Sequence, residues 1–519
     1  MKYKNTNEET SSIILLVSLL NLLVYILTLS FTSYGIFRDE LYYLACANRL
    51  DLGYVDHPPL SIWVLAVWKF IFGDSVFMIR MVPAVISSAT VFMIGLFTVR
   101  LGGGKSAVII STVTFMLSPI FLGMNTIYSM NTFDFFFWIL SAYLFLRIIE
   151  TENRNLWYTL GIVIGLGLLN KTSMLWLCAG ILIGTAFTPL REDLKTKYPY
   201  IAAGIAFLIF SPYIIWNLTH DLAHLEFMRN AATRKYGGLT PVSFVLDLIL
   251  ILNPISFLIW LPGLVFYFFN RNVKQFRAIG YIWLATFAVL FINWHSKAEY
   301  IAPAFQILFA GGAVMIIKWN ARLKRLKYAL AIPVIVMGIF LSPFARPLLP
   351  VENFLAYQSA LKLKPPSNEG HELEGLPQIY ADMFGWEDLA RNVSRVYQSL
   401  SNEERKRTIV YCGNYGEAGA IEYYSSSVPD LDGKKFPLPK VVCPHNSYWY
   451  FWPEKKQAST IIIIGGELED HLQSLERVEA AGVHKTKYAM PYENNLNIFI
   501  GRGFKRPLEE IRERDKIFI

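Results

Sequence analysis

Two acidic clusters near the beginning of the chain carry the residue types best suited to chemistry. Asp39 and Glu40 follow a long apolar stretch, and Asp56 and His57 stand directly before a pair of prolines. Ionised carboxylates beside lipid are costly, so a cluster of them at the mouth of a membrane helix normally marks a functional site. A carboxylate in such a place can take a proton from a hydroxyl group that attacks a substrate. We therefore treat Asp39 and Glu40 as candidate catalytic residues, with Asp39 as the base.

The composition of the chain indicates that membrane helices position these residues. Of 519 residues, 54% are hydrophobic and only 17% are charged, and the mean hydropathy is +0.37. Such a chain is too apolar for an ordinary soluble protein. The first apolar stretch, residues 10–37, exceeds the roughly 20 residues that cross a bilayer and lacks a small-residue cleavage site. We expect a retained first helix.

Further apolar stretches predict about 11 to 13 transmembrane helices, although the shortest of them could be re-entrant. The segment 60–72 is short and interrupted by Lys69, which favours an interfacial helix. The remaining expected spans lie near residues 78–99, 106–124, 131–149, 156–170, 174–188, 199–216, 242–268, 277–293, 300–317 and 328–346.

The basic residues predict the orientation of these spans. The net charge of +8 gathers largely in short connections between apolar stretches, which indicates membrane topology and not nucleic-acid binding. Alternate connections hold these cations, so the N-terminus is expected in the cytoplasm and the chain from about Pro350 onward outside it. The acidic loop and the segments 124–134, 170–172, 216–235 and 294–300 then share the outer face. This topology predicts Lys171 and Lys435 outside and Lys324 inside.

The last third of the chain changes character. Helix-like stretches near 385–400, 417–424 and 467–481 alternate with β-rich runs at 408–411, 460–464 and 497–500. We therefore divide the chain into a multi-span membrane domain, residues 1–347, and a soluble extracytoplasmic α/β domain, residues 348–519. Cys412 and Cys443 lie in the second domain, and a disulfide between them stays open because spacing alone does not establish one.

Five motifs in the membrane part occur in an order that resembles a known family. They are Asp39-Glu40 with Tyr43, Asp56-His57-Pro58-Pro59-Leu60, Asn131-Thr132-Phe133-Asp134, the run from Gly165 to Lys171, and Lys297 with Tyr300. This order resembles the GT-C fold glycosyltransferases of the protein O-mannosyltransferase and aminoarabinose-transferase (ArnT-like) superfamily, glycosyltransferase family 39 type. The resemblance implies sugar transfer and leaves the acceptor open. The segments 380–386 and 414–418 also resemble prokaryotic members.

The expected outward position of the site limits the sugar donors that it can use. Nucleotide sugars are not generally available outside the cytoplasm, so the expected donor is a sugar on a polyprenyl phosphate, with a glycan, lipid or protein as acceptor. Phosphate leaves without a general acid, so one base suffices and attack from the opposite face inverts the anomeric carbon. The leaving phosphate needs fixed cations, for which the candidates are Lys171, Arg229, Arg234, Lys235 and Lys297. The other candidate substrate-binding residues are Tyr43, Tyr54, Asp56, His57, Asn131, Asp134 and Tyr300.

Several alternatives stay open at this stage. Asp39 and Glu40 could be N-terminal residues of a surface helix that interact favourably with its dipole, or one of them could pair with Arg38. His57 could bind a divalent metal with Asp56 and either His220 or His224, although the spacing does not identify a metal site. Whole-protein alternatives are a transporter of polyprenol-linked sugar or lipid, in which the sugar–phosphate bond survives, and a non-catalytic envelope scaffold.

Overall fold

The computed structural model describes residues 8–235, 240–293, 296–319, 326–363, 373, 375–425, 438–452 and 458–519. Lys324 and Lys435, which the topology places on opposite sides, lie outside these ranges, as does Trp294 at the beginning of the 294–300 segment.

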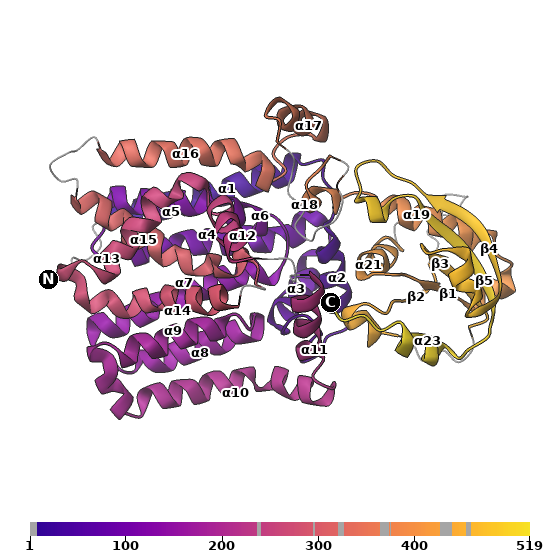
Figure 1. The fold of residues 1–519 in the computed structure, drawn as a ribbon, viewed down its shortest axis with the longest axis horizontal. Coiled ribbons are helices and arrows are strands. Elements are labelled where there is room, and N and C mark those ends of the chain that lie inside the picture. The colour runs from indigo at the N-terminus through magenta and orange to yellow at the C-terminus, as the bar shows by residue number, and fades with distance from the viewer. Residues whose placement is uncertain are drawn as a thin grey trace.

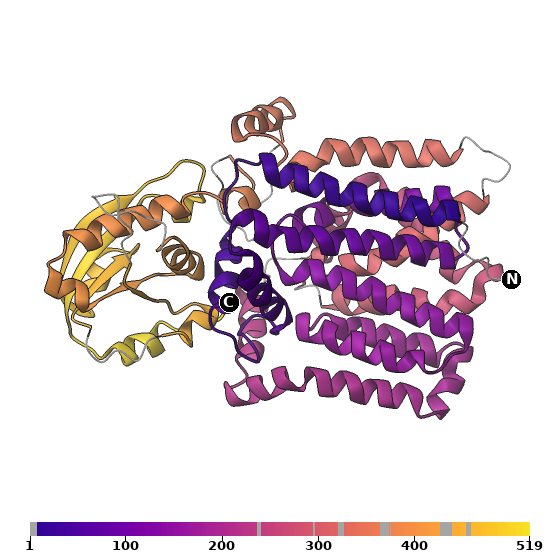
Figure 2. The ribbon, with the colours of Figure 1, turned by 180° about the vertical axis from the view of Figure 1, so that it is seen from behind.

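The first two thirds of the chain form a bundle of roughly parallel and antiparallel helices (Figures 1 and 2). The helices of this part are α1 (Glu8–Phe31), α2 (Arg38–Ala47), α3 (Leu60–Phe72), α4 (Val76–Arg100), α5 (Lys105–Met116), α6 (Pro119–Met124), α7 (Met130–Thr151), α8 (Leu156–Asn170), α9 (Met174–Ala186), α10 (Tyr198–Thr219), α11 (Ala223–Asn230), α12 (Pro241–Ile251), α13 (Phe257–Phe268), α14 (Arg277–Ile292), α15 (Ala302–Trp319) and α16 (Leu326–Ala345). By length and composition, the described residues contain six helices able to cross a membrane, or up to eight if each of two bent pairs is one span. Further shorter apolar helices accompany them, and the count of 11 to 13 stays a prediction.

Two expected spans are broken, which corrects the sequence-based boundaries. The stretch 242–268 divides into α12 and α13, with an angle of 95° across the break. Asn253 adopts a positive φ of 73° there, and Pro254 cannot donate a backbone N–H, so the helix cannot continue. The stretch 106–124 likewise divides into α5 and α6 before Pro119. Both breaks follow from local backbone chemistry that mean hydropathy does not report.

Three of the basic connections lie at one end of the bundle. The loops 152–155 and 188–193 line a common hollow with Gln275, and Arg154 pairs with Asp193 at 3.0 Å. This end lies opposite the C-terminal domain in Figure 1. These three connections therefore share one end of the bundle, whereas residues 320–325 of the last basic connection lie outside the described ranges. The side of the membrane on which this end lies stays a prediction.

Helices α2 and α3 lie between the bundle and the C-terminal domain (Figures 1 and 2). Helix α3 is a separate helix whose exposed residues include Val67, Phe70 and Ile71, as an interfacial helix requires. Helix α2 packs on the other side against the C-terminal domain, where Gly419 lies so close to Leu41 that a Cβ would be 2.8 Å from the leucine side chain.

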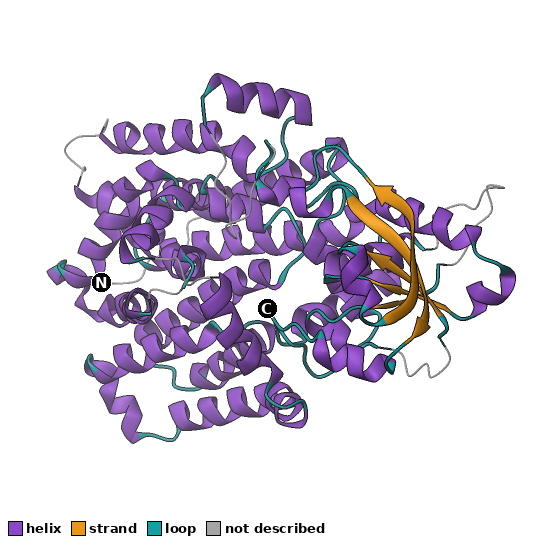
Figure 3. Cartoon of the chain, turned by 45° about the vertical axis from the view of Figure 1, so that its right-hand side comes forward, coloured by secondary structure: helices purple, strands orange, loops and turns teal. Residues whose placement is uncertain are grey.

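The C-terminal part is an α/β domain around a five-stranded mixed sheet of order β2-β1-β3-β5-β4 (Figure 3). Strands β2, β1 and β3 are parallel, whereas β5 and β4 are antiparallel to their neighbours. The elements are α17 (Val351–Ala360), α18 (Gln378–Ala381), α19 (Trp386–Ser399), α20 (Asn402–Lys406), β1 (Thr408–Tyr411), α21 (Tyr415–Tyr424), β2 (Lys440–Val442), β3 (Thr460–Ile464), α22 (Leu468–Leu472), β4 (Leu475–His484), β5 (Leu496–Phe504) and α23 (Leu508–Arg514).

One secondary-structure expectation in this domain is wrong. Residues 467–481 contain only the short helix α22, and the rest begins strand β4. Strand β4 pairs antiparallel with β5 from Leu475–Phe504 to His484–Leu496. Cross-strand packing in this long hairpin overrides the helix-favouring local composition. The boundary near residue 347 stays a prediction, although the two parts share a hydrophobic core that contains both Leu41 and Ile462. Cys412 and Cys443 are buried free thiols.

Candidate active site

Asp39 occupies the first turn of α2, at the junction of the bundle and the C-terminal domain. Its Oδ1 accepts a hydrogen bond of 2.9 Å from the hydroxyl of Tyr415, the first residue of α21. The Arg38 Nε lies 3.6 Å from the same oxygen, and the Asp39 side chain keeps 38% of its surface exposed. Asn414 caps α21 by accepting from two backbone N–H groups and so orients Tyr415. Asp39 is thus held in place yet open to solvent.

Glu40 has the opposite environment. Its side chain is fully buried and forms a bidentate pair with Arg80 of α4, at 2.7 and 2.9 Å. It also accepts from the backbone N–H groups of Phe37 and Tyr128, at 2.9 and 2.8 Å. All of its accepting capacity serves these contacts, so the geometry gives Glu40 a structural role. The alternative in which one of the two acids pairs with Arg38 is confirmed for Asp39, and Arg38 also pairs with Asp382 of the C-terminal domain.

Asp56 lies among the aromatic residues of α2. The Tyr42 hydroxyl donates to Asp56 Oδ1 at 2.6 Å, and the His57 ring stacks on Tyr43 with 4.8 Å between centroids. The Tyr43 hydroxyl accepts from the backbone N–H of Met130 at 3.3 Å, which links this group to the beginning of α7. Tyr54 is buried, and its hydroxyl donates to backbone oxygens of residues 46 and 49. Tyr54 therefore supports the loop and does not face an opening.

Lys171 joins the other predicted residues into a second cluster. Its Nζ donates to Asn131 Oδ1 at 2.7 Å, lies 3.7 Å from Asp134 Oδ2 and sits 5.4 Å above the Tyr300 ring. Asp134 is buried and accepts from Ser173 through both oxygens at 3.0 Å. The Lys171 side chain is 14% exposed. A cation held in this way, partly desolvated but reachable, suits an anionic group of a ligand.

The structure does not bring all the predicted cations together. Lys297 lies at the beginning of a short 3-10 helix, 3.9 Å from Glu299. Arg229 and Arg234 are exposed on α11 and the π-helical turn that follows it. Within the described ranges, neither arginine makes an ion pair with the clusters around Asp39 and Lys171.

The C-terminal domain contributes residues that sequence reasoning did not assign. The Asn414 side chain donates to Glu417 and Glu493 at 3.1 and 2.9 Å. Burial raises the pKa of Glu417 to about 7 and that of Glu493 well above its ordinary value, so the pair retains a proton at neutral pH. Burial lowers the pKa of His445, beside the Tyr415 ring, to about 4. The segment 414–418 was visible as a motif, but nothing in the sequence indicated its contact with Asp39.

The described residues do not form a ready metal centre. They contain no group of three or more His, Cys, Asp or Glu side chains that could hold an ion. His57 and His224 each have a buried Nε2 without a hydrogen-bond partner, while their Nδ1 atoms lie 3.0 Å from backbone oxygens. His220 instead stacks on Trp216 at 4.3 Å.

The fold and the site together define a multi-span helical membrane protein with a carboxylate at the junction with an α/β domain. A family model described as dolichyl-phosphate-mannose-protein mannosyltransferase matches residues 56–216. The lipid A galacturonosyltransferase RgtD of Rhizobium johnstonii is 23% identical over 319 residues. That match covers 58% of this chain and 64% of the relative, so the chain spans less than two thirds of the relative's length.

Solved structures share the same architecture. ArnT from Cupriavidus metallidurans bound to undecaprenyl phosphate is 11% identical with a TM-score of 0.59, over 93% of this chain and 97% of that chain. The archaeal oligosaccharyltransferase AglB from Archaeoglobus fulgidus, in complex with an inhibitory peptide and a dolichol-phosphate, is 12% identical with a TM-score of 0.50, over 88% and 69%. This likeness shows that the chain has the fold of these two proteins.

Proposed function

We propose that this protein transfers a sugar from a polyprenyl-phosphate-linked donor to an acceptor hydroxyl at the extracytoplasmic face of the cell membrane. The observation that carries the proposal is the environment of Asp39, an exposed carboxylate fixed by Tyr415 beside a fully neutralised Glu40–Arg80 pair. Of the two neighbouring acids, only Asp39 has a free face from which to accept a proton.

Asp39 takes the proton of the acceptor hydroxyl as its oxygen attacks the anomeric carbon of the donor. The bond between that carbon and the phosphate oxygen breaks on the opposite face, so the configuration inverts. The phosphate departs as a stable anion and needs no proton from a general acid. Tyr415 holds Asp39 through a 2.9 Å hydrogen bond, so the carboxylate keeps one orientation during the transfer.

The leaving phosphate is stabilised by Lys171. Its ammonium group is neutralised only in part by Asp134, at 3.7 Å, and Asn131 directs it by accepting a hydrogen bond. Lys297 provides a second cation on the same side of the bundle, beside Tyr300. Fixed cations at the position where negative charge develops lower the barrier without reorganisation. Arg229 and Arg234 instead contact anionic lipid headgroups.

Two relatives support the donor class by analogy, because the ArnT structure contains undecaprenyl phosphate and the AglB structure a dolichol-phosphate. The acceptor class is a hydroxyl-bearing glycan, lipid or protein, and RgtD is named for transfer to lipid A. The proposed topology has the N-terminus in the cytoplasm and the C-terminal domain outside.

Mass spectrometry of lipid-linked sugars and envelope glycans, in cells with and without the protein, tests this function. Loss of the protein should remove a sugar from a surface glycan and leave its polyprenyl-phosphate donor to accumulate. A transporter would instead change the membrane side of an intact lipid-linked sugar, and a scaffold would change neither quantity. Either of these results would exclude the transferase.

A further inference from the structure

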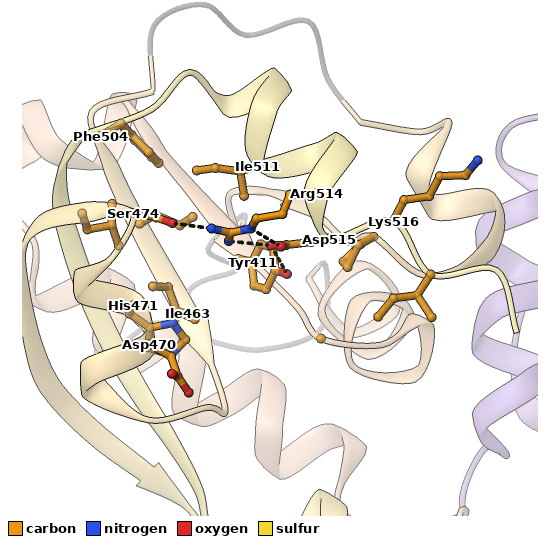
Figure 4. Close-up of a pocket in the computed structure, with 15 residues that line it drawn as sticks. Tyr411, Ile463, Asp470, His471, Ser474, Phe504, Ile511, Arg514, Asp515 and Lys516 are labelled. Carbon is orange, nitrogen blue, oxygen red and sulfur yellow. Dashed lines mark hydrogen bonds and ion pairs between the residues drawn. The ribbon is translucent and has the colours of Figure 1, made fainter. Parts of the chain in front are cut away.

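The C-terminal domain contains a cavity of about 440 Å³ that the transfer reaction does not use. It lies on one face of the sheet, because Ile461 and Ile463 line it, whereas Ile462 and Ile464 point to the core shared with α2. Helix α23 supplies the opposite wall through Ile511 (Figure 4). A cavity of this size is typical of sites for small molecules or single building blocks of polymers.

The walls of the cavity combine an apolar floor with a fixed polar array. Arg514 donates to Ser474 Oγ at 3.1 Å and to Asp515 Oδ1 at 2.7 Å, and the Tyr411 hydroxyl donates to Asp515 Oδ2 at 3.0 Å (Figure 4). The Arg514 side chain is 47% exposed, so the array remains open to a ligand. Asp470 and His471 stand on another part of the wall.

Both cations that line the cavity are paired with carboxylates. Arg514 is neutralised by Asp515, and Lys516 donates to Glu226 of α11 at 2.9 Å. Neither cation is therefore available to neutralise an anionic ligand, which disfavours phosphate as the ligand of this cavity. Paired charges with spare donors and acceptors bind hydroxyl groups well, and the isoleucine floor can cover an apolar ring face. This combination fits a neutral sugar unit.

Residues that line the cavity are close in sequence to a residue of the proposed reaction site. Tyr411 and Gly413 line it, and Tyr415 contacts Asp39. Four residues of extended chain span at most roughly 14 Å, so a short oligosaccharide can bridge this distance. On another side, Lys516 both lines the cavity and reaches the membrane part through Glu226.

We propose that this cavity is an acceptor subsite that binds a neutral sugar unit of a glycan while a hydroxyl further along the same glycan reacts at Asp39. The acceptor role rests on the proposed glycosyltransferase function. The binding of the sugar itself does not, because no residue of the Asp39 or Lys171 cluster lines the cavity.

The test uses the full-length protein in lipid nanodiscs and saturation-transfer-difference NMR. The probes are methyl α-mannoside, methyl α-galactoside and methyl β-glucoside. At least one should bind, and R514A should weaken its binding about tenfold or more, because a charge-assisted hydrogen bond is lost. The matched control is R477A, since Arg477 is 72% exposed on β4 and does not line the cavity. Asp39→Asn should leave probe binding unchanged.

The kinetic arm compares the same variants in the transfer reaction with the native glycan acceptor. R514A should raise the KM for the acceptor about tenfold and leave donor binding as in the wild type. Binding of none of the three probes, or equal binding by R514A and R477A, would overturn the sugar site. Normal acceptor KM in R514A would overturn the acceptor role. Probe binding without any sugar transfer would leave the site standing and refute the proposed function alone.

Discussion

The hydroxyl of Tyr415 lies 2.9 Å from Oδ1 of Asp39, although 376 positions separate the two residues in the sequence. Asp39 belongs to α2 of the membrane part, and Tyr415 begins α21 of the C-terminal domain. The C-terminal α/β domain therefore completes the environment of the candidate base and does not merely follow the helical bundle.

Tyr415→Phe tests this relationship. The substitution keeps the ring and removes the hydrogen bond to Asp39, which is worth about 1.5 to 3 kcal/mol when the acceptor is charged. The kcat of sugar transfer should fall about tenfold or more, with little change in the KM for the donor. Tyr423→Phe on the same helix is the control, because its hydroxyl donates to the backbone of Asp74 instead. Equal kcat values for the two variants would refute a positioning role for Tyr415.

Glu40→Gln should act on stability more than on chemistry. The change leaves Arg80 buried without a full counter-charge, and breaking a buried ion pair costs about 3 to 5 kcal/mol. Thermal unfolding in detergent should show a marked fall in Tm. Asp39→Asn should unfold near the wild-type temperature, because Asp39 is partly exposed. A normal Tm for Glu40→Gln, together with lost activity, would reassign Glu40 to catalysis.

Lys171→Met should weaken the interaction with the donor phosphate by about ten- to a hundredfold, because one charge-assisted bond is deleted. The substitution also leaves Asp134 without its cation, so the double variant Lys171→Met/Asp134→Asn separates charge loss from destabilisation. Lys195→Met, at an exposed position in the basic loops, is the control for general charge effects. Unchanged donor KM in the double variant would move the phosphate site toward Lys297.

The buried pair Glu417 and Glu493 predicts a pH dependence of stability. Burial raises the pKa of Glu417 from 4.5 to about 7 and raises that of Glu493 well above 4.5, so the folded protein holds protons that the unfolded chain releases. The contribution of this pair to the free energy of unfolding should therefore be fully present below about pH 4.5 and should be lost as the pH rises through 7. Glu493→Gln should flatten this decrease and raise Tm at pH 8. Parallel Tm curves for this variant and Glu479→Gln, an exposed control on β4, would contradict the assignment.

The sequence predicted the features that depend on local composition. Long apolar stretches marked α1, α4, α7 and α10, and the acidic loop marked Asp39. The partner of Glu40 was missed, although Arg80 is a charged residue within the expected span 78–99 and such residues usually pair.

Other features depend on contacts between distant residues or on single backbone positions. The Tyr415–Asp39 bond and the pairing of β4 with β5 are set by tertiary packing. The break at Asn253 depends on one positive φ. Neither hydropathy nor motif order reports these properties.

The central claim is that Asp39 is the base for sugar transfer. Asp39→Asn keeps the size and much of the hydrogen bonding of the side chain but removes the proton acceptor. The control is Asp74→Asn, since Asp74 is half exposed and pairs with Lys69.

The decisive measurement is the rate at which purified protein releases polyprenyl phosphate from the native lipid-linked sugar fraction in the presence of acceptor, followed by mass spectrometry. The account predicts a fall of roughly 100-fold or more for Asp39→Asn, with normal Tm and donor binding, and wild-type turnover for Asp74→Asn. Near-normal release by Asp39→Asn would contradict it.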